Sequence, residues 1–206
     1  MIWDNWFSLA SKIGLSEAQS ADMQAIFGRY YGEKHRHYHN LDHVEALLTH
    51  IDRWPEAWGD PIAVQLAAWF HDIIYLPHKR DNEHQSARFA ERQLATWTLP
   101  AAQITKISQM IIATAGHRAE GLDQDGRAFL DLDLSILGSE LAVYQQYVAS
   151  IRQEYRLYPN LIYRPARRKI LRAFLERERL YFTPTAYERW EQAARANIQA
   201  ELNSLA

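Results

Sequence analysis

The chain has no cysteine among its 206 residues, and this absence limits the chemistry that it can carry. Disulfides, thiolate metal sites and cysteine nucleophiles are all excluded. Any site for a transition metal must therefore be built from imidazole and carboxylate groups. Imidazole groups are plentiful, because nine histidines stand against only eight glycines.

Long apolar runs and a strong net charge are also missing. No stretch reaches the roughly 18 consecutive apolar residues of a spanning helix, and the formal charge is only −2. We therefore expect no membrane partner and no stable nucleic-acid partner. The N-terminal segment MIWDNWFSLASKIG lacks the basic region of a signal peptide. Together with the lack of cysteine, this favours a cytoplasmic location.

The spacing of apolar residues predicts an all-α protein. These residues recur at three- and four-residue intervals, and the alternation typical of strands is absent. We expect a single helical bundle over residues 1–206, with capping residues at Ser16, Asn40, Asp60 and Thr183. The predicted helices cover residues 3–13, 16–32, 41–53, 61–72, 82–97, 100–116, 139–158, 165–181 and 184 to near the C-terminus. Residues 117–129 are predicted to form a loop over the site, and a short turn is expected to carry DLDLSIL.

The adjacent pair His71-Asp72 follows a run, LAAWF, that is typical of a buried helix. Two polar side chains at the apolar end of a helix are costly unless something pairs with them. Adjacent helical residues point about 100° apart, so both can reach one ion only if it lies near the helix end. The acid also opposes the helix dipole there, so something should compensate for it.

Two further groups can complete such a site. In RHYHNLDHV, residues 36–44, His39 and His43 have the four-residue spacing that places ligands on one helical face. The cap at Asn40 leaves His39 outside the helix, so His43 is the preferred ligand. In FLDLDLSILG, leucines flank Asp131 and Asp133, and we expect one of them to bind a cation and the other to cap a turn.

The order of these motifs resembles the HD superfamily of metal-dependent phosphohydrolases, which is named for its His-Asp doublet. YHNLDH precedes the doublet, NEHQSA follows it, and DLDLSILG comes at the matching distance. The set is similar to small stand-alone HD proteins that are predicted phosphohydrolases. The resemblance covers roughly residues 36–138, and it implies an HD-type bundle on which the helices of residues 139–206 pack.

The resemblance implies that His43, His71, Asp72 and Asp133 bind a divalent ion, which can be Mn, Fe, Co, Ni, Zn or Mg, with one or two ions per chain. Leu134 follows the last aspartate where family members often have arginine, which leaves Asp131 open as an alternative. The Glu-Asp pair of the ppGpp hydrolase branch is absent after the doublet, so that substrate is not implied.

The implied activity is hydrolysis of a small phosphorylated metabolite, expected to be a nucleotide, by attack of metal-activated water. Asp72 is expected to be catalytic as well as a ligand. Glu83 is the candidate general acid or base, and the alternative is that it only complements a helix dipole. The protein is expected to be a monomer or a homodimer.

Several residues are candidates for additional metal or phosphate contacts. His39 and His117 can extend the ligand set, although His117 can also cap a helix C-terminus. The cations Arg36, Lys79 and Arg80 lie beside the motifs. Arg164 is the candidate phosphate contact from a basic segment, residues 152–179. The other basic residues of this segment are expected to form a solvated helix face.

Two other functions remain open. A di-iron HD-type oxygenase needs about six protein ligands, which His39 and His117 would help to supply. A non-enzymatic sensor that binds metal or nucleotide would be indicated by loss of ligands, and the chain has none of these losses.

Overall fold

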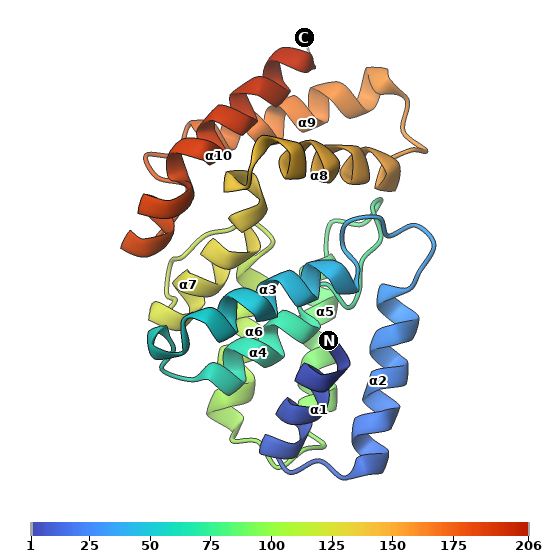
Figure 1. Ribbon diagram of the computed structural model, residues 1–206. Helices are drawn as coiled ribbons and strands as arrows, with labels where there is room; N and C mark the ends of the chain where they lie inside the picture. The colour runs from blue at the N-terminus through green and yellow to red at the C-terminus, as the bar shows by residue number, and fades with distance from the viewer. Residues whose placement is uncertain (1, 206) are drawn as a thin grey trace. The chain divides into compact units, whose positions relative to one another are not determined.

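The computed structural model describes residues 2–205, apart from the side chain of Glu56. Every regular element in that range is helical, which confirms the predicted all-α class (Figure 1). Contacts along the chain divide it into two units, Met1–Phe129 and Leu130–Ala206. The single domain expected from the sequence stays a prediction. No helix in the described range is long and apolar enough to cross a membrane.

The first unit holds six complete α-helices and the start of a seventh. They are α1 (Ile2–Lys12), α2 (Glu17–Tyr31), α3 (Leu41–Arg53), α4 (Pro61–Phe70), α5 (Asn82–Leu94), α6 (Ala101–Ala113) and the first part of α7 (Gln124–Asp133), with a short 3₁₀ helix η1 (Pro55–Ala57). Ser16, Asn40 and Asp60 each accept a backbone hydrogen bond at the start of a helix, as predicted.

Helix α4 forms the centre of the first unit. Eight of its ten residues are buried, and a helix that is apolar all round must be surrounded by others. It packs against α3, α5 and α6. Around its last turn, Trp69 contacts Phe27 at 4.7 Å and Trp6 at 5.5 Å between ring centroids. This packing fixes the end of α4, where the His-Asp pair lies.

The loop predicted for residues 117–129 is wrong over its second half, where α7 begins. The Asp123 carboxylate accepts the N–H of Gly126 at 2.9 Å, which supports the first turn of the helix. The turn predicted for DLDLSIL is wrong over residues 131–133, because α7 continues through Asp131 and Asp133, whereas a turn at Leu134 and a short 3₁₀ helix do follow. Both aspartates therefore lie on a rigid helix.

A buried aspartate ties the start of α7 to the start of α4. The Asp125 carboxylate accepts the N–H groups of Gly59 and Asp60 at 2.8 and 2.9 Å. It also accepts a hydrogen bond from the ammonium of Lys106 on α6. The polar composition of residues 117–129 suggested a loop, but it includes Asp125, whose buried carboxylate forms hydrogen bonds inside the fold.

The second unit contains the end of α7 and three long helices. They are α8 (Leu141–Glu154), α9 (Asn160–Leu175) and α10 (Pro184–Ser204), preceded by a 3₁₀ helix η2 (Ser135–Gly138). The predicted helix start at Pro165 is wrong, because α9 begins five residues earlier and contains the proline. The carbonyl of Leu161, which loses its partner, lies on an exposed residue where water can bind it.

A buried polar network joins the three long helices of this unit. Arg167 of α9 donates to Glu201 of α10 at 2.7 and 3.0 Å. Tyr144 of α8 donates to the same carboxylate at 2.5 Å. Because each group has a partner, the charges are tolerated in the core.

Candidate metal centre

His71 follows the last residue of α4, and its ring is fixed by the backbone. The side chain is 1 % exposed, and its Nδ1 lies 2.9 Å from the carbonyl oxygen of Ala68. A carbonyl can only accept, so Nδ1 carries the proton. In the neutral ring the lone pair is then on Nε2, which is the atom that faces the other candidate ligands. This arrangement is typical of metal-binding histidines.

His43 comes from the first turn of α3. The Asn40 side chain caps that turn by accepting the N–H groups of Asp42 and His43, and this places the histidine on the buried face. Its Nε2 lies 3.1 Å from Nε2 of His71. Two segments 28 residues apart in sequence thus bring two imidazole nitrogens together.

Asp72 lies beside both rings. Its Oδ2 is 3.0 Å from Nε2 of His71 and 3.8 Å from Nε2 of His43. Burial raises the pKa of the Asp72 carboxyl, but in the metal-free protein the imidazoles of His71, His39 and His43 outweigh this effect when they are protonated, together with the hydrogen bond that a protonated His71 donates. The pKa of Asp72 therefore lies well below its ordinary value, and the group is a carboxylate at neutral pH.

Asp133 completes the group from the end of α7. One ligand atom each from His43, His71 and Asp133 lies within 4.8 Å of the others. The ring of Phe129 packs edge-on against His71 at 5.9 Å, and Phe129 and Asp133, four residues apart, share one face of α7.

Asp131 has a structural role instead. It is 1 % exposed, and its carboxylate accepts the N–H groups of Phe182 and Thr183 at 2.7 and 2.8 Å and the Thr183 hydroxyl at 2.7 Å. Burial raises the pKa of Asp131, against the effect of these hydrogen bonds. It holds the segment before α10 and is not among the grouped ligand atoms, so Asp133 is the better candidate.

The donor set fits a divalent ion. Bonds of about 2.1 Å to nitrogen or oxygen place neighbouring ligands of an octahedron about 3 Å apart. The separations of 3.1 Å between His43 and His71 and 3.0 Å between His71 and Asp72 match that spacing. Two imidazole lone pairs and two carboxylates converging in a buried space also call for a cation. The buried group of His43, His71 and Asp133 can therefore hold a metal ion.

Of the other predicted residues, His39 and Glu83 interact with Asp72, and His117 interacts with Glu83. His39 stacks on Tyr75 with ring centroids 4.2 Å apart, and its charge lowers the pKa of Asp72. Burial and the charge of Asp72 raise the pKa of Glu83, while the charges of His117 and His84 lower it. His117 has a φ of 46°, a conformation that is uncommon for a residue other than glycine. Tyr75 was not predicted, because nothing in its spacing marks it.

The candidate phosphate contacts differ in their exposure to solvent. Lys79 and Arg80 lie in an exposed turn between α4 and α5. Arg164 is exposed on α9, and its role stays a prediction. Arg36 is buried, and its guanidinium donates to three backbone carbonyls. The interpretation of Arg36 as a phosphate contact is therefore wrong.

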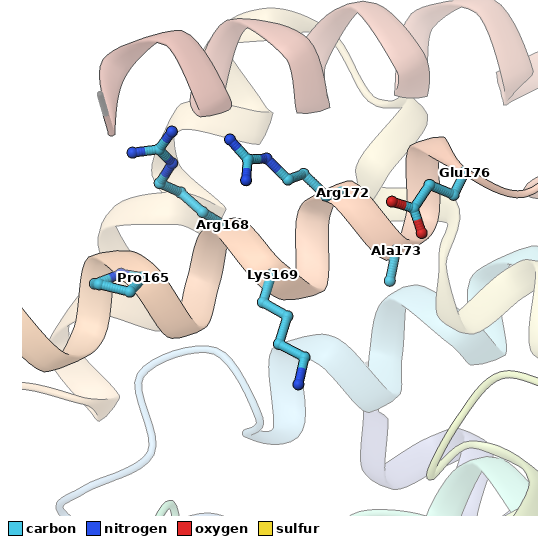
Figure 2. Close-up of a pocket in the computed structure, with 6 residues that line it drawn as sticks. All are labelled: Pro165, Arg168, Lys169, Arg172, Ala173 and Glu176. Carbon is cyan, nitrogen blue, oxygen red and sulfur yellow. The ribbon is translucent and has the colours of Figure 1, made fainter.

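Helix α9 carries a pocket with basic side chains. A pocket of about 520 Å³ is lined there by Pro165, Arg168, Lys169, Arg172, Ala173 and Glu176 (Figure 2). Arg168 and Arg172 leave the helix on one side and Lys169 on the other. Other arginines of the basic segment serve the fold, since Arg167 binds Glu201 and Arg152 donates to the carbonyls of Tyr155 and Tyr158. Only part of the segment is thus available to an anion.

Comparison with known proteins gives no relative. No family model, no curated protein and no solved structure matches the chain. The evidence for function is therefore the side-chain arrangement and the motif order.

Proposed function

We propose that this protein is a metal-dependent phosphohydrolase acting on a small phosphorylated metabolite, with a nucleotide as the expected substrate. The observation that carries the proposal is the buried convergence of His43, His71 and Asp133, with the Asp72 carboxylate 3.0 Å from His71. The motif order that resembles HD phosphohydrolases supports the same activity. A divalent ion bound there supplies hydroxide near neutral pH and offsets charge on a phosphoryl oxygen.

The chain's own residues perform the remaining tasks. His43, His71, Asp72 and Asp133 would hold the ion, which would need an open position for water and substrate. The Ala68 carbonyl keeps the proton of His71 on Nδ1, so that Nε2 can ligate. Glu83 would exchange a proton with the reacting groups, and its raised pKa and its electrostatic coupling to Asp72 support this role.

The test is metal content together with phosphatase activity. Wild type, Asp72→Ala and His50→Ala are purified without chelator and without a histidine tag, and are assayed by elemental analysis and with p-nitrophenyl phosphate plus Mn²⁺. We expect bound divalent metal and hydrolysis in wild type and His50→Ala, and neither in Asp72→Ala. His50 is the control because it lies on α3 with His43 but stacks on Trp54, at 5.7 Å.

The alternative outcomes identify the other functions. Bound iron with dioxygen consumption and no hydrolysis would favour the di-iron oxygenase. Metal without any turnover would favour the sensor. Hydrolysis retained by Asp72→Ala would reject the proposed site, and metal lost from His50→Ala would show that the wrong histidines were chosen.

A further inference from the structure

We propose that Arg36 is a positioning residue of this metal centre, and that it sets the distance between the two segments that carry the ligands. The inference rests on the proposed function, because it assigns a role at the same site. Arg36 touches neither the grouped ligand atoms nor, on this proposal, the substrate. It acts through the backbone of the doublet.

The contacts of Arg36 join both halves of the site. One terminal nitrogen donates to the carbonyl of Asp72 at 2.6 Å and to the carbonyl of His39 at 3.1 Å. The other donates to the carbonyl of Ile73 at 2.9 Å. His39 belongs to the segment that leads into α3 and His43, whereas Asp72 and Ile73 follow the end of α4. A single side chain therefore fixes one segment against the other.

The charge of Arg36 is also favourable at the end of α4, where carbonyl groups lack partners and the helix dipole is negative. The last carbonyls of a helix lack intrahelical partners, and the negative end of the dipole disfavours an acid such as Asp72 there. The buried guanidinium satisfies two of the carbonyls in this region and brings a positive charge to them. Arg36 thus adds a buried positive charge at the backbone of Asp72 and Ile73, just past the end of α4.

The site suits arginine and not lysine. Binding three carbonyls and a carboxylate requires several donors in a fixed plane, which a single ammonium does not provide. The carboxylate is that of Glu33, 3.0 Å from Nε. The rings of Tyr31 and Tyr75 lie 5.2 and 5.6 Å from the guanidinium carbon and hold it in place. Tyr75 in turn stacks on His39, so the same packing reaches the site.

Arg195 in the second unit provides a matched control. Its guanidinium donates to the carbonyls of Leu175, Arg177 and Glu178, and its Nε pairs with Glu191 at 2.7 Å. The chemistry is that of Arg36, but the carbonyls belong to the segment before α10. Loss of Arg195 should therefore affect stability without the specific effect on metal binding.

The experiment compares Arg36→Lys with Arg195→Lys in the full chain. Each apoprotein is titrated calorimetrically with Co²⁺, its visible Co²⁺ spectrum is recorded, and its unfolding midpoint is measured. We expect both variants to lower the midpoint. Only Arg36→Lys should shift the Co²⁺ spectrum and weaken Co²⁺ binding, by about 10- to 100-fold as for other residues that orient ligands.

The outcomes separate this inference from the proposed function. If wild type binds no Co²⁺, the metal centre and the role of Arg36 both fail. If wild type binds Co²⁺ and Arg36→Lys binds it equally well with the same spectrum, only the positioning role is overturned. If Arg36→Lys lacks helical circular dichroism, Glu33→Ala decides, because it removes only the partly exposed carboxylate that orients Arg36. Unchanged affinity in that variant overturns the inference.

Discussion

At the scale of single residues, the two aspartates of α7 differ in what they bind. Asp131 has both oxygens occupied by donors from residues 182 and 183, whereas Asp133 offers an oxygen to two histidines. The sequence predicted that one would be a ligand and the other a cap. The residues alone did not say which, because the donors to Asp131 lie more than 50 residues away along the chain, and the preference for Asp133 came from the resemblance to HD proteins.

This difference predicts opposite behaviour for the two asparagine variants. Asp133→Asn should lose bound metal with little change in the free energy of unfolding of the apoprotein. Asp131→Asn should keep metal but lower the free energy of unfolding by about 1–3 kcal/mol, because an amide replaces a charged acceptor of several hydrogen bonds. Elemental analysis and urea unfolding check this, and metal lost only from Asp131→Asn would reverse the assignment.

Glu83 is the second residue whose role can be tested directly. If it exchanges a proton during hydrolysis, Glu83→Gln should lower kcat by about 10²- to 10⁴-fold while metal content stays unchanged. The wild-type pH–rate profile should show a limb above the ordinary range of glutamate, since the pKa of Glu83 is raised. The rate falls with rising pH through that limb if Glu83 must be protonated, and rises if it must be ionised.

In either case the limb should be absent from Glu83→Gln. The rate and profile are measured with p-nitrophenyl phosphate and Mn²⁺. If both are unchanged in Glu83→Gln, Glu83 has no catalytic role and only complements the dipole of α5 from its first turn.

At the scale of elements, local signals predicted well and long-range ones did not. The caps at Ser16, Asn40 and Asp60 each act within three residues, so the sequence contained all of the information needed to place three helix starts. The start of α7 is different. Its polar residues include Asp125, whose partners Gly59 and Asp60 lie 65 or more residues away. A buried polar side chain of this kind is indistinguishable from a loop residue until the fold is known.

Helix α9 illustrates the same limit. Pro165 favours a helix start locally, but buried Tyr163 and Arg167 hold both sides of it in one helix. The pair His71-Asp72 could be recognised for the opposite reason, since its cost at the end of an apolar helix is visible in the sequence itself. Arg36, which binds the backbone carbonyls of Asp72 and Ile73, was identified only as a nearby cation.

At the scale of the whole molecule, metal binding should be coupled to folding. The ligand groups come from α3, the end of α4 and the end of α7, so they converge only in the folded chain. A ligand that binds only the folded state at 100 times its dissociation constant adds about 2.7 kcal/mol to the free energy of unfolding. In a chain of this size, that corresponds to about 5–11 °C in the unfolding midpoint.

We therefore expect Mn²⁺ to raise the thermal midpoint of wild type by this amount, and EDTA to reverse the increase. His71→Ala should show no shift with Mn²⁺, while His50→Ala should behave as wild type. Differential scanning calorimetry also reports whether the chain unfolds in one transition or two. Two separate transitions would show that the two units unfold independently. A single transition shifted as a whole would support the one cooperative domain expected from the sequence.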